Sequence, residues 1–153
     1  MEPRLNPYQA APEAIQAMRA LDAYVHSSGL EPSLIELVKI RASQINGCAF
    51  CLHMHTRDAR ARGESEERLY LLDAWRESPL YTEGERAALA WTEAVTLVSQ
   101  TRVPDAVYEE VRRQFAEDAL VKLTLLVATI NAWNRTSISF RAVHPVKPED
   151  AAA

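Results

Sequence analysis

The sequence predicts an all-α protein because helix signals recur throughout it and strand signals are scarce. Alanine, the strongest helix former, is the commonest of its 153 residues. Apolar residues repeat at spacings of three and four, and no alternating apolar segments are joined by a hairpin-type turn. A chain of this length suits one domain. We therefore expect a single orthogonal bundle of roughly six to eight helices over residues 1–153, with its core in about residues 12–143.

Seven helices can be delimited by their apolar faces and their capping residues. They are expected at residues 12–27, 32–46, 48–63, 65–75, 82–98, 104–115 and 118–140. Gly47 and Gly63 suit the left-handed backbone at helix C-termini, and Thr82 with Glu85 forms a capping box at a helix start. The stretch 120–130 is apolar enough for a buried strand, but a helix is favoured because no partner strand is visible.

The apolar faces are clearest in the first two of these helices. The first face consists of Ile15, Met18, Leu21 and Val25, and the second of Leu34, Ile35, Val38 and Ile45. Later along the chain, Ser78-Pro79 interrupts the helical pattern, and Pro104-Asp105 opens the next helix. The segment 144–153 contains two prolines and is expected to be loose.

Composition excludes several functional classes. The net charge of −4 lacks the basic surplus of a nucleic-acid-binding protein. The N-terminus shows no secretory signal, and the most apolar run is shorter than the ~18 residues of a membrane span. Two cysteines are too few for a disulfide scaffold, so we expect a cytoplasmic protein whose vicinal Cys48 and Cys51 are catalytic or metal-binding.

Four residues form the candidate active site. Cys48, Cys51 and His55 follow one another at spacings of three and four, so they share a helical stripe. The first turn of a helix favours a thiolate, and His55 could exchange a proton with Cys51. If the chain reverses at Gly47, Glu36 comes to lie beside His55, where burial is expected to raise its pKa. We expect Cys48 to be the more exposed thiol and Cys51 the better activated one.

Other interpretations of the same residues exist. The two thiols could be inert and buried, or Cys48, Cys51, His53 and His55 could bind zinc. On an ideal helix, however, His53 points about 160° away from the Cys51–His55 stripe, which favours redox chemistry. Near the C-terminus, packing or interface roles are expected for Asn131, Trp133, Asn134 and Arg135.

The pattern Glu-x11-Cys-x2-Cys-x3-His resembles the alkylhydroperoxidase D-like branch of the carboxymuconolactone decarboxylase superfamily. Glu36, Cys48, Cys51 and His55 match its motif positions, and the strings SQINGCAFC, MHTRDARARGE and INAWNR agree as well. The resemblance implies an all-α homo-oligomer of dimers gathered into trimers or hexamers. It also implies a thiol-dependent peroxidase or disulfide reductase in antioxidant defence.

This resemblance further implies an enzyme with no bound cofactor or metal, supplied with electrons by an external dithiol such as a dihydrolipoyl group. Its partner would be a peroxiredoxin or a lipoyl carrier protein. Binding to nucleic acid or to a membrane is not expected. The alternatives are a zinc-binding or redox-sensing oligomer without turnover, and a lactone decarboxylase-type enzyme. The decarboxylase branch lacks the cysteine pair that Cys48 and Cys51 form here.

Overall fold

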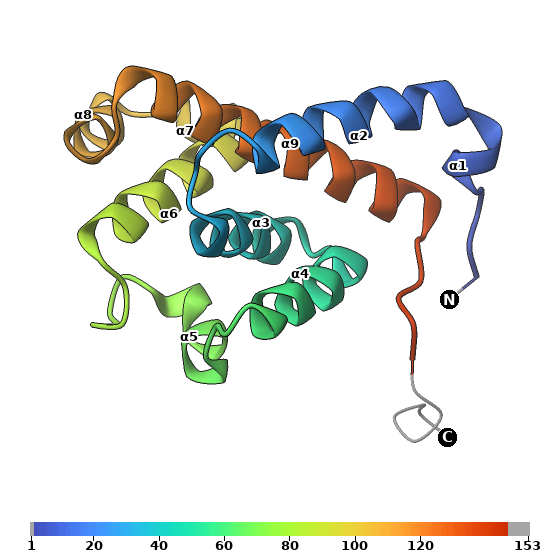
Figure 1. The fold of residues 1–153 in the computed structure, drawn as a ribbon, viewed down its shortest axis with the longest axis horizontal. Helices are drawn as coiled ribbons and strands as arrows, with labels where there is room; N and C mark the ends of the chain where they lie inside the picture. Colours follow the sequence, from blue (N-terminus) through green and yellow to red (C-terminus); the bar gives the residue numbers. More distant parts are fainter. Residues whose placement is uncertain (1, 147–153) are drawn as a thin grey trace.

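The computed structural model describes residues 2–146, and in that range it contains helices and no strand (Figure 1). The helices are α1 (Pro7–Ala10), α2 (Pro12–His26), α3 (Pro32–Asn46), α4 (Ala49–Ala61), α5 (Glu66–Tyr70), the 3₁₀ helix η1 (Leu72–Ala74), α6 (Glu83–Thr96), α7 (Val98–Thr101), α8 (Asp105–Gln114) and α9 (Glu117–Phe140).

The all-α prediction is confirmed, and each of the seven expected helices has a counterpart among the described residues. The segment 65–75 is divided between α5 and η1, while the apolar stretch 120–130 lies inside α9. Two four-residue helices, α1 and α7, were not expected, because single turns are too short to display a periodic apolar face. The expectation for residues 147–153 lies outside the described residues.

Helix α3 lies at the centre of the molecule, between α4, α6 and α9 (Figure 1). It is buried on nearly all sides because it separates two apolar clusters. Leu34, Ile35 and Val38 face the larger cluster, with α2, α6, α8 and α9. Leu37 and Ile40 face the second, with α4, η1 and α6. A helix enclosed in this way is a rigid support for the polar residues that it carries.

The chain reverses direction between α3 and α4 at Gly47. Its φ of +68° lies in the left-handed region, which glycine adopts without the strain that a Cβ would cause. The next residue, Cys48, is the N-cap of α4, and α4 packs back along α3. The predicted hairpin is therefore present, and it places the start of α4 beside the end of α3.

The predicted capping box at the start of α6 is also present. Thr82 Oγ1 accepts a hydrogen bond from the Glu85 N–H at 3.2 Å, and Glu85 Oε2 accepts one from the Thr82 N–H at 2.8 Å. We expect Thr82→Ala to lower the free energy of unfolding by about 1 kcal/mol, measured by urea denaturation. The exposed Ser139→Ala serves as control, and an equal loss in both variants would contradict the capping role.

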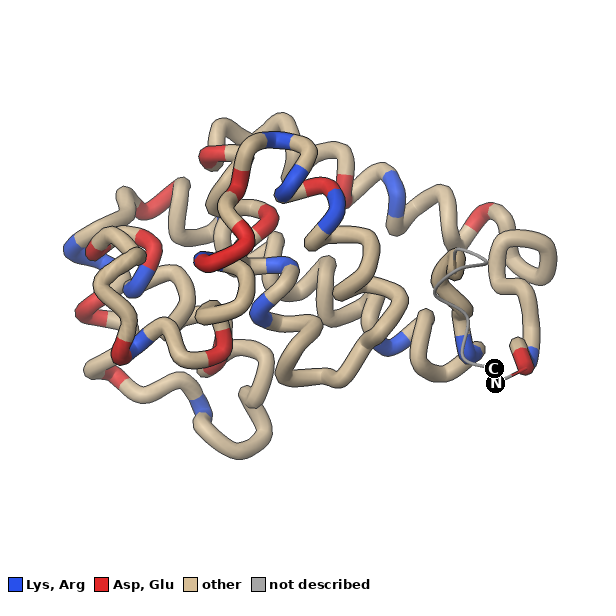
Figure 2. Tube along the Cα trace, turned by 90° about the horizontal axis from the view of Figure 1, so that it is seen from below, with Lys and Arg blue, Asp and Glu red and all other residues tan. Residues whose placement is uncertain are grey.

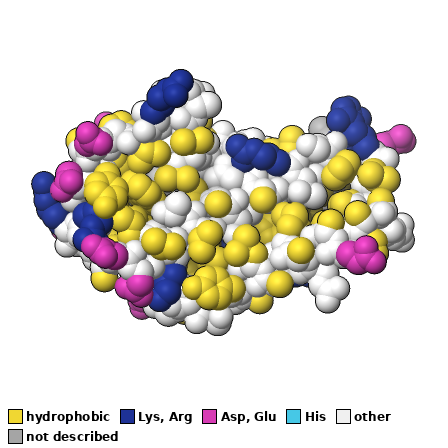
Figure 3. Space-filling view, turned by 90° about the horizontal axis from the view of Figure 1, so that it is seen from above, with side chains coloured by type: hydrophobic (Ala, Val, Ile, Leu, Met, Phe, Trp, Pro, Cys, Tyr) yellow, Lys and Arg dark blue, Asp and Glu magenta, His cyan; other side chains and the backbone are white. Residues whose placement is uncertain are grey.

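The surface combines an uneven charge distribution with exposed apolar residues. Figure 2 shows charged residues of both signs to be most frequent at the end of the molecule that carries α8. Apolar side chains spread over the face seen in Figure 3, to which α2 and α9 contribute. Leu21 and Tyr24 on α2 and Val121 on α9 are among the exposed large apolar residues. Among residues 2–146, no helix is both long and apolar enough to cross a membrane.

Candidate redox site

The two cysteines lie at the start of α4 and are not joined by a disulfide. Their sulfurs are 2.7 Å apart, and each residue is only 1% exposed. Ala42 and Ile130 pack against them from α3 and α9, and Phe50 and Trp133 cover this cluster on its outer side. The cluster keeps bulk water away from a pair of sulfurs that are close enough to interact directly.

The two thiols have very different proton affinities. The hydrogen-bond contact with the Cys51 thiol lowers the pKa of Cys48 to about 7, although burial opposes this change. The Cys51 N–H, 3.4 Å from Cys48 Sγ, favours the same thiolate. The same contact raises the pKa of Cys51, and burial raises it further. Of the two thiols, Cys48 is therefore the one that loses its proton more readily.

This arrangement corrects two expectations about the pair. Cys51 was expected to be the better activated thiol, but the pKa is lowered at Cys48 and raised at Cys51, and the Cys51 N–H points at Cys48 Sγ from the first turn of α4. Cys48 was expected to be the more exposed thiol, but the two are equally buried within the described chain.

Glu36 and His55 form the second half of the site, as the hairpin predicted. His55 Nδ1 lies 2.9 Å from Glu36 Oε2, and the carboxylate is 2% exposed. A pKa raised by burial was expected, and burial is indeed the largest single influence. The hydrogen bond and charge of His55, together with Lys39 and Arg62, outweigh it and lower the pKa of Glu36. Glu36 is thus a carboxylate in the neutral pH range.

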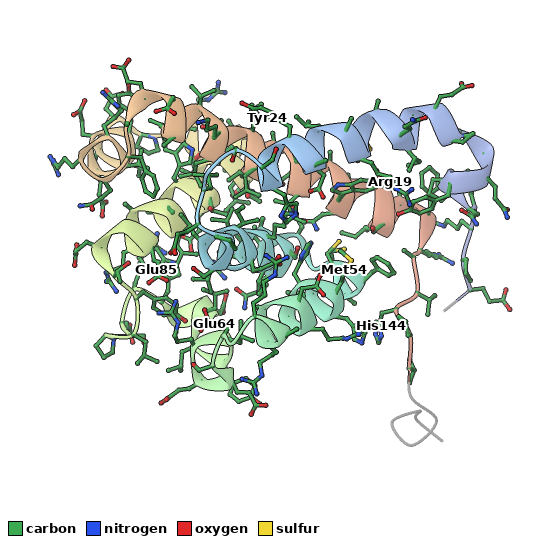
Figure 4. The ribbon with its side chains drawn as sticks, viewed as in Figure 1. Arg19, Tyr24, Met54, Glu64, Glu85 and His144 are labelled. Carbon is green, nitrogen blue, oxygen red and sulfur yellow. The ribbon has the colours of Figure 1, made fainter. Side chains whose placement is uncertain are left out.

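An ionised Glu36 fixes the tautomer of His55. A carboxylate can only accept hydrogen bonds, so Nδ1 of His55 must be the donor, and Nε2 is left as a proton acceptor. His55 and Cys51 line the same pocket of about 240 Å³. Arg19 of α2 and Met54 of α4 line it as well (Figure 4). The hydrogen bonds of the described residues include none between His55 and a sulfur, so a proton passing between them needs a bridging water or substrate atom.

Asn134 on α9 is a polar neighbour whose connection to the sulfurs was not expected from the sequence. It is fully buried, donates to Ser43 Oγ at 3.0 Å and accepts from Asn46 Nδ2 at 2.8 Å. The polar groups of Asn134 and Ser137 act to lower the pKa of both cysteines, which favours their thiolate forms. The signal in the sequence was an asparagine on the inner face of an apolar helix, which we interpreted as packing. Asn134 in fact couples α9 to both α3 and the sulfurs.

We expect Asn134→Ala to lower the free energy of unfolding by about 2–3 kcal/mol, because buried partners on α3 lose their hydrogen bonds. The pKa of Cys48 should rise at the same time, since one hydrogen bond that favours its thiolate is removed. Urea denaturation and ultraviolet titration of the thiolate measure the two effects. Lys122→Gln, which removes an ion pair with Asp118 at the other end of α9, should leave the Cys48 pKa unchanged. An Asn134→Ala variant that is as stable as the wild type and has an unchanged Cys48 pKa would contradict the coupling.

Lys39 was also missed by the sequence analysis. Although 2% exposed, its Nζ donates to Asp22 Oδ1 at 2.9 Å and to His26 Nε2 at 2.8 Å. Burial and the Lys39 charge together lower the pKa of His26, which makes it a neutral acceptor. The three residues connect α2 to α3 beside the pocket of His55, and Lys39 and Asp22 line that pocket. A lone lysine in an apolar helix gave no indication of partners on another helix.

The zinc interpretation finds no matching geometry. His53 stacks on His144 with the ring centroids 4.7 Å apart, so it is occupied by the segment after α9. Within residues 2–146, no group of three or more His, Cys, Asp or Glu side chains is placed to hold a metal ion.

Comparison with known proteins shows the family to which the chain belongs. The sequence profile of the carboxymuconolactone decarboxylase family matches residues 9–94, more than half of the chain. The YdfG protein of Bacillus subtilis is 45% identical over 139 residues, covering 91% of this chain and 95% of that protein.

Two solved structures extend the comparison. ATU0492 of Agrobacterium tumefaciens, a protein of unknown function proposed to be the antioxidant defence protein AhpD, has a TM-score of 0.93 and 49% identity, covering 95% of this chain and 100% of that one. A peroxidase-related protein from Ralstonia eutropha with an alkylhydroperoxidase AhpD core has a TM-score of 0.79 over 90% of this chain and 74% of that one. At 18% identity, the latter likeness concerns the fold alone. The chain therefore belongs to the carboxymuconolactone decarboxylase family, in its alkylhydroperoxidase D-like branch.

Proposed function

We propose that this protein is a thiol-dependent peroxidase of antioxidant defence, with Cys48 as the attacking thiolate and Cys51 as the resolving thiol. The observation that carries the proposal is the pair of sulfurs 2.7 Å apart, with the pKa of Cys48 lowered to about 7. A thiolate is the reactive form of cysteine, and a neighbouring thiol can resolve its oxidised product.

In the first step, Cys48 attacks the outer oxygen of an organic hydroperoxide. An S–O bond forms, the O–O bond breaks, and the alkoxide leaves with a proton from solvent as the alcohol. Cys48 becomes a sulfenic acid, so the sulfur loses two electrons and the peroxide gains them. The Cys51 sulfur then attacks the Cys48 sulfur, and the S–S bond replaces the S–O bond as water leaves.

The second step needs a base, because the pKa of Cys51 is raised. His55 is suited to this role, since Nε2 is free and Cys51 borders the same pocket. The proton taken from Cys51 is returned to the departing hydroxide to make water. Glu36 holds the ring in this tautomer and stabilises its protonated form.

An external dithiol, such as a dihydrolipoyl group, restores the enzyme by two thiol–disulfide exchanges. Thiol–disulfide exchange in the opposite direction, from the reduced cysteine pair to a disulfide of another protein, would make the protein a disulfide reductase. A peroxiredoxin or a lipoyl carrier protein is the proposed partner, in the cytoplasm. We also propose a homo-oligomer built from dimers. The exposed apolar residues Tyr24 of α2 and Val121 of α9 support it, as do the apolar side chains on the face that Figure 3 shows.

The decisive experiment follows hydroperoxide consumption with dihydrolipoamide as donor, in the wild type and in Cys51→Ser. We expect catalytic turnover in the wild type and at most one equivalent consumed by the variant. Equal steady-state rates would overturn the proposal. Metal analysis of protein purified without chelator is the parallel test, because one zinc per chain would favour the metal-binding alternative.

A further inference from the structure

Cys48 borders a pocket that differs from the one shared by Cys51 and His55. This pocket, of about 370 Å³, lies between the start of α4 and the end of α9. Its lining includes Arg4, Cys48, Phe50, Ser137, Arg141 and Ala142. Its volume falls in the range of sites that hold small organic ligands. Cys48 therefore borders a compartment that neither Cys51 nor His55 lines.

The charges lining this pocket are two arginines and no acid. Arg4 is held in place, since its N–H donates to Phe140 O at 3.0 Å and its Nη1 donates to Ser139 O at 3.2 Å. Arg141 is the C-cap of α9. Neither guanidinium forms an ion pair with a described residue, although the whole chain has a net charge of −4. A cationic pocket in an acidic protein indicates an anionic ligand.

An apolar pocket of about 270 Å³ adjoins the cationic one, and the two share Phe50, Ser137 and Ala142. The side chains of Tyr8, Trp133 and Phe140 also line it. A ligand that spans both pockets would have an apolar body beside a negatively charged group, with Cys48 within reach of its reacting atoms.

We propose that the preferred substrate is an organic hydroperoxide that carries a carboxylate on an apolar or aromatic body. This inference rests on the proposed peroxidase function and specifies its substrate class. Arg4 and Arg141 bind the carboxylate, because guanidinium groups match its two oxygens. The apolar body lies against Phe50 and Trp133, and the hydroperoxyl group faces Cys48. The chemistry is that of the two steps above: the O–O bond breaks, and the hydroxy acid is the product.

The kinetic test compares cumene hydroperoxide with its ring-carboxylated analogue. We expect the wild type to show at least a 10-fold higher kcat/KM for the carboxylated compound, and Arg4→Gln with Arg141→Gln to reduce that ratio by about 10-fold. The matched control, Arg57→Gln with Arg113→Gln, removes the same charge from exposed arginines elsewhere and should keep the ratio. If the wild type prefers the neutral peroxide, or if both double variants lose selectivity equally, the proposal is wrong.

A binding measurement separates the two proposals. Calorimetry with 4-isopropylbenzoate, which has no peroxide group, is carried out on Cys48→Ser in the presence and absence of the Arg4 and Arg141 substitutions. Binding that weakens by at least 10-fold without the arginines supports the anion site, even if no peroxide is turned over. Turnover of both peroxides without carboxylate binding would leave the peroxidase function in place and overturn the substrate assignment.

Discussion

Replacing Cys48 with serine should reduce hydroperoxide turnover by about 10³-fold or more, because the attacking sulfur is removed. The loss should appear in the first chemical step, since the remaining Cys51 is buried, and burial raises the pKa of its thiol even without Cys48. In Cys51→Ser that first step should still occur, and it should stop at a sulfenic acid on Cys48. Dimedone trapping with mass spectrometry identifies the modified sulfur in each variant.

The pH dependence gives an independent check on which thiol attacks. The rate of the first oxidation should rise with pH with a midpoint near 7, because the pKa of Cys48 is about 7 and the thiolate is the reactive form. Stopped-flow measurements from pH 5.5 to about 9 cover this transition. Trapping of a sulfenic acid on Cys51 in Cys48→Ser, at the wild-type rate, would reverse the two roles.

Replacing Glu36 with glutamine should lower turnover by about 10²-fold, the usual size of a lost acid–base contribution. The loss should fall on disulfide formation, where His55 takes the Cys51 proton, while sulfenic acid formation on Cys48 continues. Quenched-flow analysis separates these two steps. Glu110→Gln, on the exposed face of α8, removes the same charge and should change neither rate. An equal slowing of both steps by Glu36→Gln would contradict the proposed role.

The same substitution should also change how stability depends on pH. Burial raises the pKa of Glu36, but its contacts with His55, Lys39 and Arg62 lower it overall, below the ordinary 4.5. A group with a lowered folded pKa stabilises the protein fully above the unfolded pKa and loses that contribution as pH falls through the folded one. The stability advantage of the wild type over Glu36→Gln should therefore be complete above about pH 4.5 and decrease below it. Urea denaturation at several pH values tests this.

Local signals in the sequence predicted most of the fold. The capping box of Thr82 and Glu85 and the reversal at Gly47 depend on neighbouring residues, and both are present. The hairpin at Gly47 also predicted the pairing of Glu36 with His55, because the lengths of two adjacent helices determine which residues meet. These predictions depended only on residues that lie within a few consecutive helical turns of one another.

The electrostatics of the site could not be predicted in the same way. The order of the two thiol pKa values depends on which sulfur accepts the Cys51 N–H, a detail of the N-cap geometry. The lowered pKa of Glu36 depends on Lys39 and Arg62 as well as on burial. Asn134 approaches the sulfurs from a helix far along the chain, so no local spacing could place it there. These features require the tertiary packing.

Both ends of the described chain lie beside the start of α4, and this affects how the protein should be handled. The N-terminal segment is tied to the end of α9 through Arg4, and the segment after α9 reaches α4 through the stacking of His144 on His53. Residues of these two segments line the apolar and cationic pockets next to Phe50. Trimming residues 2–6, or fusing an affinity tag directly before them, would open or obstruct the pockets beside Cys48 and Phe50. Recombinant proteins with different N-terminal ends therefore differ at these pockets, and tests of the proposed activity should compare proteins with matched termini.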